Sequence, residues 1–272
     1  MYELSAHPLL QPSARLARAP VDRGRAGQGD LRAVPSRRAG AAKVNRTDLF
    51  RDHAGVVRVK VCCIASIEEA ELALEAGADA LGLVSAMPSG PGVIPDADIA
   101  TIAEWVGTRA ATVLLTSRTS AEGIDEQLRH GRPSVLQICD ALPDDEMAIV
   151  RERHPDVVLM PVVHVRDDDS VREAVGLAAS ADAILLDSGN PSARVKELGG
   201  TGRVHDWQIS RAIRDVVGVP LFLAGGLRAE NVADAVRTVR PFGVDVCSGV
   251  RRDGRLDRST LTEFMSAVRG AI

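Results

Sequence analysis

Val59-Lys60-Val61-Cys62-Cys63 is the first of eight short apolar runs in this chain. The runs centre near Val59, Gly82, Val113, Leu136, Met160, Leu185, Phe222 and Asp245, and six of the seven intervals between these centres span 23–31 residues. Each run is rich in Val, Ile, Leu and Ala and shows no clean alternation with polar residues. Runs of this kind are typical of strands that are buried on both faces.

Segments with helical periodicity separate the runs. Residues 69–76 end at Gly77, a residue type that commonly terminates helices. Residues 231–236 carry apolar side chains at three- and four-residue spacing. Eight repeats of strand and helix predict an α/β fold, a (β/α)8 TIM barrel, over residues 55–272. The alternative is an open doubly wound sheet, but the regular repetition favours closure.

Composition sets the broad class of the chain. Its 272 residues are 45% hydrophobic but only 3% aromatic, so the core must consist mainly of Val, Leu, Ile and Ala. No apolar run approaches 20 residues, which predicts that no segment spans a membrane. The four cysteines lack C-x-x-C spacing, so reduced thiols in a cytoplasmic protein are the simpler interpretation.

Charge separates an N-terminal extension from the barrel. Residues 1–52 contain ten Lys and Arg against five Asp and Glu, whereas the rest contains 23 against 32. The first segment is rich in Arg, Ala, Pro and Gly, so we predict a disordered basic extension over residues 1–54. It lacks the apolar core of a secretory signal. The acidic barrel argues against a nucleic-acid partner.

The ends of the apolar runs carry residues suited to chemistry. In a barrel, the carboxyl ends of the strands form the active face. Cys62 ends the first run and Asp187 the sixth, so a thiol and a carboxyl group meet there as a candidate base and acid. Cys139 and Cys247 also fall at strand ends, but a single cysteine is more often a small core residue.

Glycines dominate the loops expected after the last three strands. Gly225-Gly226 follows the seventh run and Ser248-Gly249 the eighth, where barrels frequently bind phosphate through backbone N–H groups. Tight turns are the alternative explanation. Gly199, Gly200 and Gly202 lie in the loop after Asp187 and predict a mobile cover over a substrate. Asp206 is expected to cap the next helix.

Taken together, these pieces resemble the phosphoribosylanthranilate isomerase family, barrel enzymes of tryptophan biosynthesis. The similarity begins near Val57 and runs to the C-terminus. It rests on Val59-Lys60-Val61-Cys62, residues 75–82, Leu186-Asp187-Ser188, Gly199-Gly200-Thr201-Gly202, Asp206-Trp207, residues 223–227, Glu230-Asn231-Val232, residues 239–246 and Ser248-Gly249-Val250. Each piece is short, but their order and spacing are specific.

The resemblance implies an aldose–ketose isomerase that performs an Amadori rearrangement without cofactor or metal. Asp187 would be the general acid and Cys62 the general base. The substrate phosphate would lie against Gly202, Gly225, Gly226, Ser248 and Gly249, and the aglycone near Asp245 and Cys139. The partner would be a small phosphorylated sugar, with no nucleic acid and no membrane, and the enzyme would be a cytoplasmic monomer or homodimer.

Four stretches depart from the family pattern. Cys63 replaces a glycine, Gly92 replaces an arginine at the substrate, Cys139 replaces a histidine and Cys247 replaces a serine. Loss of the arginine would weaken binding of an anthranilate carboxylate by roughly 1.5–3 kcal/mol, unless Arg118 or Arg203 substitutes from a neighbouring loop. An alternative is therefore a divergent relative that isomerises another phosphoribosylamine or amino sugar lacking a carboxylate.

A second alternative comes from a different class, a thiolate metal-binding or redox-sensing barrel. Cys62, Cys63 and Cys247 fall at the ends of the first and eighth runs, which are neighbours in a closed barrel, and His205 is a further candidate ligand. Adjacent residues of a strand point to opposite sides, so Cys62 and Cys63 are not expected to face the same site.

Overall fold

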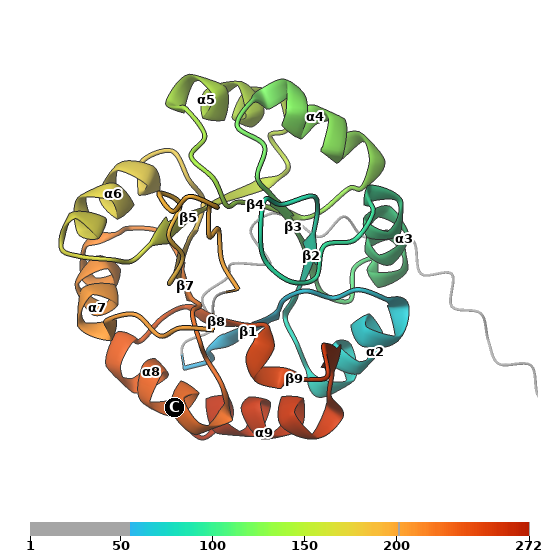
Figure 1. Cartoon of the computed structure of the whole chain (residues 1–272), viewed down its shortest axis with the longest axis vertical. Helices are drawn as coiled ribbons and strands as arrows, with labels where there is room; N and C mark the ends of the chain where they lie inside the picture. The colour runs from blue at the N-terminus through green and yellow to red at the C-terminus, as the bar shows by residue number, and fades with distance from the viewer. Residues whose placement is uncertain (1–54, 201, 272) are drawn as a thin grey trace, which may run out of the picture. The chain divides into compact units, whose positions relative to one another are not determined.

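The computed structural model describes residues 55–200 and 202–271 of the chain. The predicted extension, residues 1–54, lies outside this part. Strand labels follow Figure 1: β1 (Arg58–Val61), β2 (Ala80–Val84), β3 (Ala111–Thr116), β4 (Val135–Ile138), β5 (Val158–His164), β6 (Ile184–Asp187), β7 (Leu221–Leu223) and β8 (Gly243–Val246). These strands are parallel and form a closed barrel in chain order. The barrel prediction is confirmed and the open sheet is wrong, because β1 pairs with β8.

Helices surround the barrel on its outer side (Figure 1). They are α2 (Ile67–Ala76), α3 (Asp96–Val106), α4 (Ala121–His130), α5 (Asp144–Arg153), α6 (Asp169–Ala178), α7 (Trp207–Val216), α8 (Ala229–Val239) and α9 (Arg258–Arg269). Two helix ends match the sequence predictions. Gly77 follows α2 with a left-handed φ of 90°, and the Asp206 side chain accepts the N–H of Gln208 at the start of α7. No helix in the described residues is long and apolar enough to cross a membrane.

Strand residues alternate between two apolar cores. Val59 and Val61 of β1 join the core between the sheet and the helices, as do Leu81 and Leu83 of β2. The other set fills the barrel interior and includes Ala80, Val113, Val135, Met160, Leu185 and Phe222. Because both faces of the sheet are covered, the strands read as continuous apolar runs rather than as alternating ones.

A short hairpin follows β8 and anchors the loop after β1. After η1 (Ser248–Val250), β9 (Arg251–Arg252) pairs antiparallel with β10 (Arg255–Leu256). The Arg251 guanidinium donates to the backbone carbonyls of Cys62 and Cys63 and forms an ion pair with Glu69 at 2.9 Å. Glu69 also accepts the N–H groups of Ala65 and Leu256. The loop after β1 is therefore fixed by residues from the end of the barrel.

Two glycine-to-alanine substitutions test the interior packing. A Cβ on Gly243 in β8 would lie 2.7 Å from Cδ1 of Phe222, whereas a Cβ on Gly176 in α6 would meet nothing within 4 Å. We expect Gly243→Ala to lower the free energy of unfolding by about 1–3 kcal/mol through overpacking. Gly176→Ala should raise it by roughly 0.5–1 kcal/mol, because alanine favours the helix. Urea unfolding measures both, and equal effects would contradict this packing.

Candidate active site

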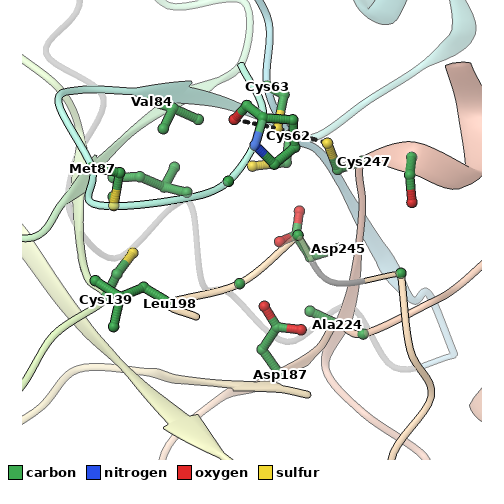
Figure 2. A pocket seen from close by; sticks show the side chains of 18 of the residues that line it. Cys62, Cys63, Val84, Met87, Cys139, Asp187, Leu198, Ala224, Asp245 and Cys247 are labelled. Atoms are coloured by element: carbon green, nitrogen blue, oxygen red, sulfur yellow. Dashed lines mark hydrogen bonds between the residues drawn. The ribbon is translucent and has the colours of Figure 1, made fainter. Parts of the chain in front are cut away.

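A solvent-open cavity lies at the mouth of the barrel, at the carboxyl ends of the strands. Most of the residues singled out from the sequence line it: Cys62, Cys139, Asp187, Gly202, Gly225, Gly226, Asp245 and Ser248. Gly249 is not among the lining residues, since it packs against the backbone of Leu227, where a Cβ would overlap the carbonyl. Figure 2 shows Cys62, Cys63 and Cys247 grouped on one side of this cavity and Asp187 on the other.

The Cys62 thiol lies buried at the end of β1, directly beside β2. Gly82 makes room for it, because a Cβ at that position would come within 2.8 Å of Sγ of Cys62 and 3.2 Å of Nζ of Lys60. A hydrogen bond from the Cys63 thiol and the positive charge of Lys60 lower the pKa of Cys62, although burial acts in the opposite direction. The site thus favours a thiolate at Cys62, as a general base requires.

A buried ion pair lies beneath the thiol. Nζ of Lys60 on β1 is 2.9 Å from Oδ1 of Asp245 on β8, and Lys60 is fully buried. Burial alone would lower the pKa of Lys60, but the charge of Asp245 raises it above its ordinary value. Lys60 therefore stays an ammonium ion and supplies a fixed positive charge near Cys62. Sequence reasoning overlooked Lys60, although its position two residues before Cys62 places both side chains on the same face of the strand.

Asp187 ends β6 with its carboxyl group in the cavity and is only 8% exposed. Burial raises its pKa to about 6, and the nearby charge of Asp245 acts in the same direction. The N–H of Ser188 donates to Oδ1 at 2.7 Å. Gly199 approaches the other oxygen so closely that a Cβ there would lie 2.7 Å from Oδ2. A carboxyl group with this pKa holds a proton that it can donate near neutral pH.

Three loops meet on the side of the cavity next to β7 and β8. Gly226 has a left-handed φ of 61°, and a Cβ there would lie 2.8 Å from the carbonyl oxygen of Gly202. Gly202 in turn faces Ser248, whose Oγ is 3.8 Å from the position of a Cβ at residue 202. Close backbone packing of this kind leaves a wall made of main-chain groups and one hydroxyl, which suits an anion such as phosphate.

The opposite wall is apolar and includes Val84, Met87, Leu115 and Leu198, with Cys139 beside them. None of the described residues that line the cavity is basic; the two arginines considered as replacements, Arg118 and Arg203, lie outside the lining. The loop after β6 contacts the loop after β2, since the hydroxyl of Ser89 donates to the carbonyl of Lys196. The two loops therefore meet beside the apolar wall of the cavity. Movement of the glycine-rich loop over a substrate stays a prediction.

Cys63 lies where the sequence did not predict it. It was expected to point away from Cys62, yet both side chains line the same cavity. The expectation is wrong because β1 ends at Val61 and Cys63 adopts a left-handed φ of 64°, so strand alternation no longer applies. Its Sγ lies 2.6 Å from Sγ of Cys247 (Figure 2).

The metal-binding alternative finds no support in the part of the chain that the structure describes. No group of three or more His, Cys, Asp or Glu side chains there is placed to hold a metal ion. His205 instead interacts through Nε2 with the Ser210 hydroxyl at 2.7 Å, and burial lowers its pKa to about 4. His164 is also buried, and its Nε2 lies 3.3 Å from the carbonyl of Cys139.

Comparison with known proteins places this site in a family. Residues 59–267 match the model of N-(5'-phosphoribosyl)anthranilate (PRA) isomerase. The isomerase of that name from Methanocella arvoryzae is 34% identical over 215 residues, which are 79% of this chain and 99% of the relative. The crystal structure of the Thermotoga maritima enzyme is 30% identical, with a TM-score of 0.69 over 79% of this chain and 100% of that one.

A second solved structure contains a ligand. It is phosphoribosylanthranilate isomerase in complex with reduced 1-(o-carboxyphenylamino)-1-deoxyribulose 5-phosphate, and it is 28% identical with a TM-score of 0.66. The matched region comprises 79% of this chain and 100% of that one. The family match extends over the whole barrel, including the strands that carry Cys62, Asp187 and Asp245. This chain therefore belongs to the N-(5'-phosphoribosyl)anthranilate isomerase family.

Proposed function

We propose that this chain isomerises N-(5'-phosphoribosyl)anthranilate to 1-(o-carboxyphenylamino)-1-deoxyribulose 5-phosphate. The observation that carries the proposal is the shared cavity: a thiol with a lowered pKa and a carboxyl group with a raised pKa line it together, next to a wall of main-chain groups. This is the arrangement that an acid–base rearrangement of a sugar phosphate needs. The family match supports the same reaction over the carboxylate-free alternative.

The first step opens the sugar ring. Protonated Asp187 gives its proton to the ring oxygen, the bond from that oxygen to C1 breaks, and the nitrogen lone pair forms a protonated Schiff base with C1. The raised pKa of Asp187 supports this role, because the group still holds a proton near pH 6. Its loss of the proton leaves a carboxylate, which the N–H of Ser188 stabilises at 2.7 Å.

The second step moves the double bond. The Cys62 thiolate removes the proton from C2, and the electron pair shifts to form the enolamine while the Schiff-base nitrogen becomes neutral. Protonation at C1 and loss of the C2 hydroxyl proton then give the ketone at C2. Proton exchange with solvent returns Cys62 to the thiolate and Asp187 to the acid, so the overall reaction neither gains nor loses atoms. Lys60 keeps Cys62 ionised without touching the substrate, because its ammonium group is fully buried beneath the thiol.

Substrate binding would divide the cavity into two parts. The phosphate would lie against Gly202, Gly225, Gly226 and Ser248, with Gly249 supporting the turn behind them. The aromatic ring would lie against the apolar wall near Cys139, with Asp245 between the two parts. A cytoplasmic location, independence from cofactors and a monomeric or homodimeric state stay predictions from the sequence.

Removal of either catalytic group should abolish most turnover without unfolding the barrel. We expect Cys62→Ala and Asp187→Ala each to lower kcat for N-(5'-phosphoribosyl)anthranilate by roughly 10²–10⁴-fold. Asp234→Ala, at an exposed position on α8, is the matched control and should keep full activity. Fluorescence of the anthranilate group follows the reaction, and circular dichroism confirms the fold. Wild-type protein that leaves this substrate unchanged would refute the proposed function.

Substitution in the phosphate wall should act on binding. A Cβ on Gly226 would force the Gly202–Arg203 backbone away, whereas a Cβ on Gly218 meets nothing within 4 Å. We expect Gly226→Ala to raise KM about tenfold or more, and Gly218→Ala to change it less than twofold. Competitive inhibition by inorganic phosphate should weaken in parallel. An unchanged inhibition constant in Gly226→Ala would place the phosphate elsewhere.

The raised pKa of Asp187 also predicts a pH-dependent stability. Above pH 6 this buried carboxylate is charged in the folded state, which burial disfavours, while below about pH 4 it is protonated in both folded and unfolded states. We expect Asp187→Asn to raise the free energy of unfolding by roughly 1–3 kcal/mol at pH 7.5 and by almost nothing at pH 4. Urea titrations at both pH values measure the difference. A stabilisation of Asp187→Asn that occurs only at pH 4 would contradict the raised pKa of Asp187.

A further inference from the structure

Two thiols outside the proposed chemistry lie unusually close together. Sγ of Cys63 and Sγ of Cys247 are 2.6 Å apart, and neither group has a step in the rearrangement (Figure 2). Nonbonded heavy atoms normally approach to about 3.5–4.0 Å, and a disulfide bond is roughly 2.0 Å long. The two sulfur atoms are thus much closer than ordinary packing neighbours.

Barrel closure brings these residues together. β1 pairs with β8 in a register that matches Lys60 with Asp245 and Val61 with Val246, and the N–H of Cys62 donates to the Val246 carbonyl at 2.8 Å. Cys247 therefore follows β8 directly beside the end of β1. The left-handed φ of Cys63 turns its thiol to the cavity side, where Cys247 lies.

The surrounding backbone holds the Cys63 thiol in place. Arg251 binds the carbonyls of Cys62 and Cys63, which fixes the backbone on one side. On the other side Gly92 has a φ of 79°, and a Cβ there would lie 3.0 Å from Sγ of Cys63. Because the thiol is already confined next to its neighbour, little conformational entropy is lost when a bond forms between them.

We propose that Cys63 and Cys247 form a reversible disulfide that switches the enzyme to a less active state. The oxidant is a low-molecular-weight disulfide such as oxidised glutathione. The two protein thiols lose two protons and two electrons as the Sγ–Sγ bond forms, and the oxidant's S–S bond is reduced to two thiols. Exchange with excess dithiol reverses the reaction. The cross-link does not depend on the proposed function, whereas the loss of activity rests on it.

The expected loss of activity follows from the position of the cross-link, because Cys63 and Cys247 both line the cavity that contains Cys62. In the reduced protein the Cys63 thiol donates a hydrogen bond that lowers the pKa of Cys62. A disulfide has no S–H group, so oxidation removes this donor and less Cys62 is ionised at neutral pH. Lys60 continues to favour the thiolate, and for this reason we expect a reduced rather than an abolished turnover.

Peptide mapping of the full-length protein tests the cross-link without any substrate. Protein is incubated with oxidised glutathione, free thiols are alkylated, and tryptic peptides are examined by mass spectrometry. Cys62 and Cys63 fall on one peptide, so single variants separate them. We expect the link to the Cys247 peptide to persist in Cys62→Ser and to disappear in Cys63→Ser and Cys247→Ser. A link that is absent from wild type, or that survives in Cys63→Ser, overturns the proposal.

Thermal unfolding gives a second readout that does not require catalysis. The bond would close a loop between residues 184 positions apart. We expect oxidation of Cys62→Ser protein to raise Tm by about 5–15 °C, with return to the starting value after dithiothreitol. The matched variant Cys62→Ser with Cys247→Ser should show no such rise. An unchanged Tm in the cross-linked protein would contradict the geometry described above.

Activity measurements test whether the disulfide lowers turnover. We expect oxidised wild type to lose about tenfold in kcat/KM and to recover with dithiothreitol, whereas Cys247→Ser should lose less than twofold under the same treatment. Equal losses in both proteins would mean that glutathione modifies Cys62 itself, and the switch would be wrong. If wild type does not turn over N-(5'-phosphoribosyl)anthranilate, the proposed function fails, while peptide mapping and Tm still decide the disulfide.

Discussion

The ion pair between Lys60 and Asp245 is the interaction on which the active face depends. It places a positive and a negative charge inside the barrel, 2.9 Å apart and almost completely buried. Two charges in such a place are tolerated only as a pair, since removal of one partner from a buried pair typically costs about 3–5 kcal/mol. The pair also joins β1 to β8, where the barrel closes. The same pair therefore helps to close the barrel and sets the charge near Cys62.

This interior charge explains how one cavity can hold the proposed base and the proposed acid at the same pH. Lys60 and Cys63 together lower the pKa of Cys62, while burial and the negative charge of Asp245 raise that of Asp187. Thiols ordinarily hold their protons at neutral pH and carboxyl groups ordinarily lose them, so the site moves each group away from its usual state. Groups whose environments shift their pKa values in opposite directions divide the acid and base roles between them.

Much of the architecture was predictable from the sequence because it follows from local periodicity. The eight apolar runs correspond to β1–β8, and Gly77 and Asp206 flank helices as expected. The presence of Cys62 and Asp187 at one barrel mouth followed from the rule that strand ends share a face. Such inferences succeed because they require only which face or end of an element a residue occupies.

The remaining details depend on contacts between distant residues or on one backbone angle. The pairing of Lys60 with Asp245 requires the register of closure, which no local pattern contains. The placement of Cys63 depends on a left-handed φ that a non-glycine residue seldom adopts. The departures at Cys63 and Gly92 looked independent in sequence but are one spatial feature, because the thiol occupies the space in which a side chain at residue 92 would begin.

Arg251 has a consequence for how the enzyme is made. Its guanidinium holds the carbonyl of Cys63, although it lies 188 residues later in the chain. During synthesis the proposed catalytic thiol therefore emerges from the ribosome long before the group that orients its loop. A truncated nascent polypeptide that stops short of β9 would carry both reactive side chains yet lack the anchor of the Cys62 loop. The proposed catalytic centre therefore lacks the anchor of its thiol loop until the final hairpin has been translated.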